Sequence, residues 1–242
     1  MNWYKISQFV FSDIHSKEDL TNMLKNPQTL NAIVQQAENI NKEEYGKRLG
    51  TSNPTLLYHG SPQTKLEQLL PVKGRRSHGF MGAEYQVDNQ GVFLTDSKQV
   101  ATYFGKNRSD SGEYGVYQAY VNLDKVLDIA NLPSNIRSLG LKMVNAYDGT
   151  RKTRFARSDM WWLLDKSEFI NAIKSLGFNS VRFRESIAIE KSAGNGNTYL
   201  VFDPKDIAIK SKQNDVIKDF DSLWNYINQG KKEQPQEQNE LV

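Results

Sequence analysis

The stretch Thr55-Leu56-Leu57-Tyr58-His59 has the composition of a β-strand, and Gly60 and Ser61 follow it directly. The turn signal Ser52-Asn53-Pro54 precedes it, so the pattern predicts a strand that begins just after a turn. A histidine followed by glycine at the end of a strand sets a hydrogen-bonding ring beside a backbone position that lacks a Cβ. The predictions of the fold and of the candidate site both begin from this stretch.

The same strand-like composition recurs further along the chain. Short runs rich in Val, Tyr, Phe and Thr, bounded by Gly, Asn, Asp or Pro, predict strands at residues 91–95, 115–121, 180–184 and 198–202. Helical patterns lie between them at residues 98–104, 136–146 and 162–176. Because strands outnumber helices and no regular helical crossovers join them, the predicted fold class is α+β rather than doubly wound α/β.

The two ends of the chain predict helices. Residues 16–45 carry apolar side chains at spacings of three and four and are interrupted near Pro27, which predicts two short helices before a loop at residues 46–54. Residues 216–227 predict an amphipathic helix that packs on the domain, and the polar tail after it predicts disorder. The predicted organisation is therefore a helical segment (1–50), a main domain (51–213), a C-terminal helix (214–229) and a disordered tail (230–242).

Composition excludes several classes of function. The 242 residues are 38% hydrophobic and 24% charged, an ordinary balance for a globular protein, and a net charge of +3 gives no strong field for nucleic acid. With no cysteine and three scattered histidines, we expect neither a thiolate nucleophile nor a metal site. We see no signal peptide and no membrane-spanning run, which predicts a soluble, cytoplasmic protein that does not enter a membrane.

Three separated motifs carry a family resemblance: Leu57-Tyr58-His59-Gly60-Ser61, then Gly91-Val92-Phe93-Leu94-Thr95-Asp96 with Ala101-Thr102-Tyr103, then Thr198-Tyr199-Leu200-Val201-Phe202-Asp203. Together they resemble the diphtheria-toxin and poly(ADP-ribose)-polymerase branch of the ADP-ribosyltransferases, known by a His, Tyr, Glu triad. The sequence is similar to such domains in phage or bacterial polyvalent proteins. The resemblance covers about residues 55–209 and implies a split β-sandwich with short helices, and NAD as the substrate.

The resemblance implies a role for each matching residue of the NAD site. His59 would hydrogen-bond a ribose hydroxyl, Gly60 would let its backbone approach the nicotinamide carboxamide, and Ser61 could add a hydroxyl contact. Phe93 and Tyr103 would clamp the flat, cationic nicotinamide ring. The family normally has Tyr where this chain has Phe93, which keeps the stacking and loses a hydroxyl.

The third motif departs further, because Thr198 stands where the family has Glu. A carboxylate 4 Å from the developing cation contributes about 4 kcal/mol at an effective dielectric near 20, which is on the order of a thousandfold in rate. Glu185 or Glu190, in a loop expected at residues 184–197, could replace it, and the alternative is that both are solvated hairpin residues. Chain elongation to poly(ADP-ribose) is not expected.

Other residues admit two interpretations. Arg75 or Arg76, in a segment that could form a mobile lid at residues 71–90, could pair with the pyrophosphate, or the segment is an exposed basic turn. Trp161 and Trp162 are interpreted as core anchors. For His59 itself the alternative is a strand-end histidine satisfied by local backbone.

The function predicted from the sequence is mono-ADP-ribosyl transfer from NAD to a macromolecular acceptor. A protein acceptor is favoured over nucleic acid, and the chain would act as a phage or bacterial effector. Two alternatives stay open: a catalytically inactive module that binds NAD or a protein partner, and an RNA- or DNA-associated module.

Overall fold

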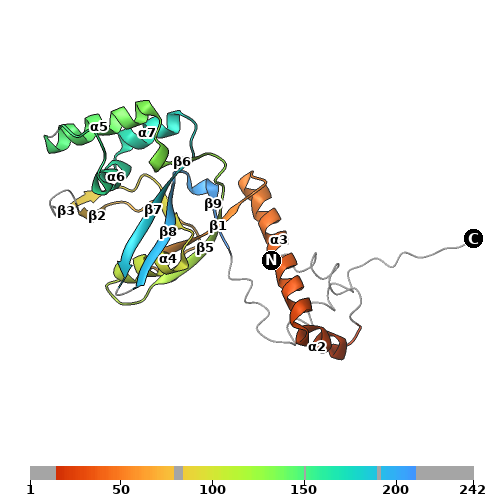
Figure 1. Cartoon of the computed structure of the whole chain (residues 1–242). Helices are drawn as coiled ribbons and strands as arrows, with labels where there is room; N and C mark the ends of the chain where they lie inside the picture. Colours follow the sequence, from red (N-terminus) through yellow and green to blue (C-terminus); the bar gives the residue numbers. More distant parts are fainter. Residues whose placement is uncertain (1–14, 79–83, 150, 190–191, 211–242) are drawn as a thin grey trace, which may run out of the picture. The chain divides into compact units, whose positions relative to one another are not determined.

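The computed structural model describes residues 15–78, 84–149, 151–189 and 192–210 (Figure 1). The chain divides into two compact units, Met1–Arg48 with Ser211–Val242, and Leu49–Lys210. The C-terminal helix and tail expected from the sequence lie outside the described residues. Within the described residues, no helix is both long and apolar enough to cross a membrane.

In the first unit, two helices follow each other as the sequence predicts. Helix α2 (Lys17–Lys25) is capped by Ser16, whose Oγ accepts the Asp19 N–H at 3.1 Å while the Asp19 carboxylate accepts the Ser16 N–H at 2.9 Å. Helix α3 (Pro27–Leu49) begins with proline at a position where its missing N–H costs nothing. The loop was expected to begin at residue 46, which is wrong, because α3 continues through Gly46 to Leu49. One glycine inside a helix costs only about 1 kcal/mol, so the helix tolerates it.

The second unit is built on a seven-stranded sheet of order β6-β7-β8-β4-β1-β5-β9. Pairing is antiparallel throughout except between β6 and β7, which are parallel. Strands β2 (Arg75–His78) and β3 (Glu84–Val87) form a separate two-stranded sheet. The strands of the main sheet are β1 (Thr55–Ser61), β4 (Val92–Thr95), β5 (Gly115–Val121), β6 (Val126–Asp128), β7 (Ser180–Ile189), β8 (Ser192–Val201) and β9 (Ile207–Ile209). The α+β prediction is confirmed.

The sheet is split between its two central strands. Seven residue pairs join β1 to β5, whereas β1 and β4, both fully described, are paired at one position, Tyr58 with Thr95. If that register continued, Gly60 would lie opposite Phe93. Instead the Phe93 carbonyl accepts a hydrogen bond from the His59 ring, so the backbone ladder ends where the two halves separate.

Four helices belong to this unit: α4 (Lys98–Asn107), α5 (Ser134–Asp148), α6 (Arg157–Leu164) and α7 (Ser167–Ser175). Figure 1 shows α5, α6 and α7 grouped together beside the sheet. The prediction of a single helix at residues 162–176 is wrong, because the structure has two helices there. Helix α6 ends in 3-10-type hydrogen bonds, which the Asp165 N–H donates to the Trp162 carbonyl and the Lys166 N–H to the Leu163 carbonyl. Short 3-10 turns lie at Ile129–Asn131 and Pro204–Asp206.

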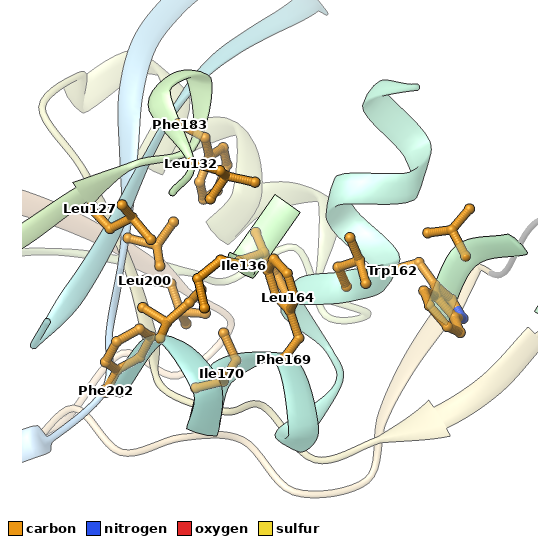
Figure 2. Close-up of a cluster of buried hydrophobic side chains, with 14 residues drawn as sticks. Leu127, Leu132, Ile136, Trp162, Leu164, Phe169, Ile170, Phe183, Leu200 and Phe202 are labelled. Atoms are coloured by element: carbon orange, nitrogen blue, oxygen red, sulfur yellow. The ribbon is translucent and has the colours of Figure 1, made fainter. Parts of the chain in front are cut away.

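Hydrophobic clusters cover both faces of the sheet. Successive residues of β8 alternate between them, with Leu200 in the cluster beneath the helices and Val201 in the opposite one. Figure 2 shows Ile136, Phe169 and Ile170 gathered with Leu200 in the first cluster. The second cluster contains Leu57, Leu69, Val92, Leu94, Ala119, Val121 and Val201. These two layers hold the split sheet from both sides.

The loop expected at residues 184–197 is also wrong. Strands β7 and β8 pair through it, from Arg184 opposite Asn197 to Ile189 opposite Ser192. The polar and glycine-rich run is drawn into the sheet by backbone pairing with its partner strand, which local composition does not reveal.

Candidate active site

A pocket opens on the sheet at the split between β1 and β4. The empty space between its walls is about 490 Å³, a volume that includes space open to solvent. Its walls come from β1, β4, β8, α4 and α6. The lining residues are Tyr58, His59, Gly60, Phe93, Leu94, Thr95, Ala101, Phe104, Arg108, Trp161 and Thr198.

Strand register explains why residues far apart in sequence share this pocket. Thr95 of β4 is paired on one side with Tyr58 and on the other with Thr198. Directly paired residues share a face of the sheet, as do residues two apart on one strand. Phe93 is therefore on that face as well, and these four side chains form the floor of the pocket.

The His59 ring spans the split and has a defined tautomer. Its Nδ1 lies 2.7 Å from the Phe93 carbonyl oxygen, which can only accept, so Nδ1 carries the hydrogen. Burial lowers the pKa of the imidazole below its ordinary value, the Arg108 charge acts in the same direction, and the hydrogen bond to Phe93 partly opposes them. The ring is thus held neutral near pH 7 with Nε2 as an acceptor.

Gly60 lies against helix α4 rather than against open space. A Cβ at this position would come within 1.8 Å of the Ala101 carbonyl oxygen and 2.7 Å of the Gly105 nitrogen. Both obstacles are backbone atoms, which cannot turn away. The requirement for glycine is accounted for by the close approach of strand and helix, so the explanation from ligand approach is not needed for it.

Aromatic rings form the walls of the pocket. Phe93 packs on Trp161 with ring centroids 6.1 Å apart, and Trp161 meets the Phe183 ring edge-on at 4.7 Å. Phe104 supplies a ring from α4. The partly buried rings of Phe93, Phe104 and Trp161 offer π surfaces to a flat ligand.

The predicted convergence of Tyr103 with His59 and Phe93 is not what the structure has. Ala101, Phe104 and Arg108 follow one another at helical spacings of three and four, which sets them on one stripe of α4. Ala101 contacts Gly60, so this stripe faces the pocket. Tyr103 lies off the stripe and outside the lining, with its ring edge-on to Phe104 at 5.6 Å.

The charge of the pocket is positive. Among the described residues that line it, Arg108 is ionised near pH 7 and none is a carboxylate. Thr198 is 3% exposed and takes the place of the expected acid. The described lining therefore has hydroxyl groups but no carboxylate.

A carboxylate does lie just outside the lining, where it joins two strands. Asp96 accepts hydrogen bonds from the backbone N–H of Asn197 at 2.8 Å and from its Nδ2 at 2.7 Å. Gly196 permits this approach, because a Cβ there would lie 2.7 Å from the Ser97 Cβ. This contact fixes β8 at the residue before Thr198.

Of the remaining predicted residues, Ser61 has a described side chain and lies outside the lining. Ser61 is buried, and its Oγ accepts the Gln63 N–H at 3.1 Å in the turn after β1. Arg75 and Arg76 are on β2 of the separate small sheet. Glu185 is on β7 opposite Gly196, and Glu190 lies outside the described residues.

Seven lining residues have no site role in the sequence prediction: Tyr58, Leu94, Thr95, Ala101, Phe104, Arg108 and Trp161. The spacing from Ala101 to Phe104 and Arg108 was a readable signal for α4. Trp161 was interpreted as a core anchor together with Trp162. Trp162 is buried in the core at 9% exposure, whereas Trp161 is partly buried, packs against that core and also lines the pocket.

The α+β fold of this unit is consistent with that of an ADP-ribosyltransferase domain. The family model described as ADP-ribosyltransferase in polyvalent proteins matches residues 50–218. The chain therefore belongs to that family, whose general activity is transfer of ADP-ribose from NAD. Comparison with curated proteins and with solved structures gave no match.

Proposed function

We propose that the pocket at the split binds NAD and that the domain transfers a single ADP-ribose to a macromolecular acceptor. The observation that supports this most directly is the meeting of His59, Phe93 and Thr198 in one hollow. These residues come from three strands, and they stand at the positions of the three motifs that carry the resemblance. Family membership supports the general reaction.

In this proposal the site binds NAD through its two chemically different halves. The neutral His59 ring, with Nδ1 engaged by the Phe93 carbonyl, offers Nε2 to a ribose hydroxyl. The rings of Phe93, Phe104 and Trp161 hold the nicotinamide, in place of the pair Phe93 and Tyr103 expected from sequence. Stacking and cation-π attraction contribute about 0.5 to 2 kcal/mol per ring.

The bond between nicotinamide and ribose then breaks through a cationic transition state. No described lining residue supplies a carboxylate to stabilise it, so we propose slow transfer, lower by on the order of a thousandfold than with a carboxylate at 4 Å. Glu185 and Glu190 remain candidates to supply the missing charge. Without it, elongation to a polymer is not part of the proposal.

Labelled NAD incubated with host lysate tests this function. Wild-type protein should label an acceptor, His59→Ala should lose the label, and His15→Ala, which changes an exposed histidine of the other unit, should retain it. Thermal unfolding of each variant controls for folding. Absence of both label transfer and nicotinamide release from wild type would contradict an active transferase.

The lack of a lining carboxylate favours a second candidate, a module that binds NAD without transferring ADP-ribose. Thr198→Glu separates the two, because it adds the charge at the position of the family motif. We expect faster nicotinamide release than in wild type, with Thr198→Gln as the uncharged control of equal size. Measurable NAD binding with no turnover in wild type, Thr198→Glu or Thr198→Gln would support the binding module.

The choice of acceptor rests on charge. With a net charge of only +3, the chain offers no strong field for nucleic acid, so we propose a protein acceptor. Action as a phage or bacterial effector, and in the cytoplasm of the producing cell or of an infected host, stays a prediction.

A further inference from the structure

A cation stands at the pocket although the family motifs include none there. Arg108 lines the hollow together with His59 and Gly60. Its guanidinium carbon lies 5.3 Å from the centroid of the Phe104 ring, which is a cation-π distance. The side chain is exposed overall, so its charge lies toward the mouth of the pocket rather than at the floor.

The position of this cation is fixed by backbone packing. Arg108 follows the last turn of α4, and α4 is held against β1 by the contact of Gly60 with Ala101 and Gly105. The backbone of α4 is therefore packed closely against β1 at Gly60. Arg108 is the last residue of the stripe that faces the pocket. The contact between Gly60 and α4 therefore also positions the backbone from which the Arg108 side chain extends.

The sign of the charge decides which part of a dinucleotide Arg108 can serve. A positive group disfavours the cationic nicotinamide ring and the cation that forms when the ring leaves. It favours a diphosphate, whose oxygens match the two-pronged guanidinium. The diphosphate is covalently attached to the adenosine ribose that His59 would hold, and the charge of Arg108 is felt at His59.

We propose that Arg108 is the diphosphate-binding residue of this domain, recognising the ADP half of NAD. This rests on the proposed function, and it replaces the assignment of that role to Arg75 or Arg76. Arg108 would discriminate ligands that carry a diphosphate from those that carry only the nicotinamide ring. It would contribute to binding rather than to stabilising the transition state.

A simpler account is that Arg108 only complements the dipole at the C-terminal end of α4. The two accounts predict different measurements. A dipole partner changes the stability of the helix and leaves ligand preference unaltered. A diphosphate ligand changes affinity for one class of ligand and leaves the other unchanged.

Titration of the full-length chain with NAD, ADP-ribose and nicotinamide distinguishes them. Arg108→Gln should weaken NAD and ADP-ribose by about tenfold or more and leave nicotinamide within about twofold of wild type. Arg108→Lys should keep part of the affinity, since it keeps the charge without the fork. The exposed Arg137, on α5, provides the control Arg137→Gln, which should bind all three ligands as wild type does.

Each other result has a defined meaning. If Arg108→Gln binds NAD and ADP-ribose as tightly as wild type, the inference is wrong and the proposed function is untouched. If it weakens nicotinamide by the same factor as NAD, Arg108 shapes the ring pocket and the inference is also overturned. If wild type binds neither NAD nor nicotinamide, the proposed function fails, and the role of Arg108 fails with it.

Discussion

At the scale of single residues, the site depends on which atoms are already engaged. The Phe93 carbonyl takes the Nδ1 hydrogen of His59, so only Nε2 remains for a ligand. Gly60 is held by the backbone of α4, so its lack of a Cβ serves the fold before it serves any ligand. Both residues belong to the sequence motifs and line the pocket, but these two contacts join distant segments and are visible only in three dimensions.

Replacing His59 should change how stability depends on pH. Its pKa is lowered in the folded state, chiefly by burial, so its stabilising contribution is complete above the ordinary value of 6.5 and is lost as pH falls below it. We expect wild type to lose more stability between pH 7.5 and 5 than His59→Gln, which cannot titrate. Chemical denaturation at several pH values measures this. Parallel curves for the two proteins would contradict it.

Gly60→Ala tests whether the glycine serves the fold or the ligand. The new Cβ would meet backbone atoms at 1.8 and 2.7 Å, so we expect a loss of at least about 3 kcal/mol in the free energy of unfolding. Gly105→Ala is the matched control, because its nearest obstacle is a Tyr114 ring carbon at 3.1 Å, and it should cost less. A Gly60→Ala protein as stable as wild type that no longer binds NAD would restore the explanation from ligand approach.

At the scale of elements, sequence patterns found the strands better than their partners. The strand at residues 115–121 was predicted to its ends, and β1 and β4 within two residues. The run at residues 192–197 was not read as strand, because its Ser, Gly and Asn content is overridden by pairing with β7. The sequence placed Tyr103 rather than its neighbour Phe104 on the pocket face of α4. Neighbouring helical positions differ by about 100°, and only contact with Gly60 fixes the rotation of the helix.

Helix α6 offers a direct test of two neighbouring tryptophans with different tasks. Trp162 is buried and packs on the Tyr147 ring at 4.6 Å, so Trp162→Ala should cost about 3 to 5 kcal/mol of stability. Trp161 lines the pocket, so Trp161→Ala should weaken nicotinamide binding by about tenfold with a smaller loss of stability. Urea unfolding and ligand titration of both variants measure the two effects. An equal pattern of losses would show that α6 acts as one packing element.

At the scale of the whole molecule, the pocket is a product of long-range assembly. Its floor comes from β1, β4 and β8, and one wall comes from α6, more than sixty residues after β4. The sequence predicted the fold class and two residues of the floor, Phe93 and Thr198, because motifs and strand composition are local. It could not predict that an intervening helical segment would contribute Trp161, since nothing near that residue indicates which surface it faces.

The unit Leu49–Lys210 contains both hydrophobic clusters of the sheet and every residue of the pocket. A fragment of residues 49–210 should therefore fold cooperatively and bind nicotinamide within about twofold of the full chain.

Leu49 must be kept, because it is buried and its carbonyl accepts the Asn122 Nδ2 at 3.2 Å. Thr51 must be kept as well, since its Oγ1 donates to the Asp124 carboxylate at 2.7 Å. A fragment of residues 54–210 loses both contacts and should be less stable by about 2 to 4 kcal/mol. Circular dichroism with urea titration measures the difference, and an unfolded 49–210 fragment would mean that the domain needs the other unit to fold.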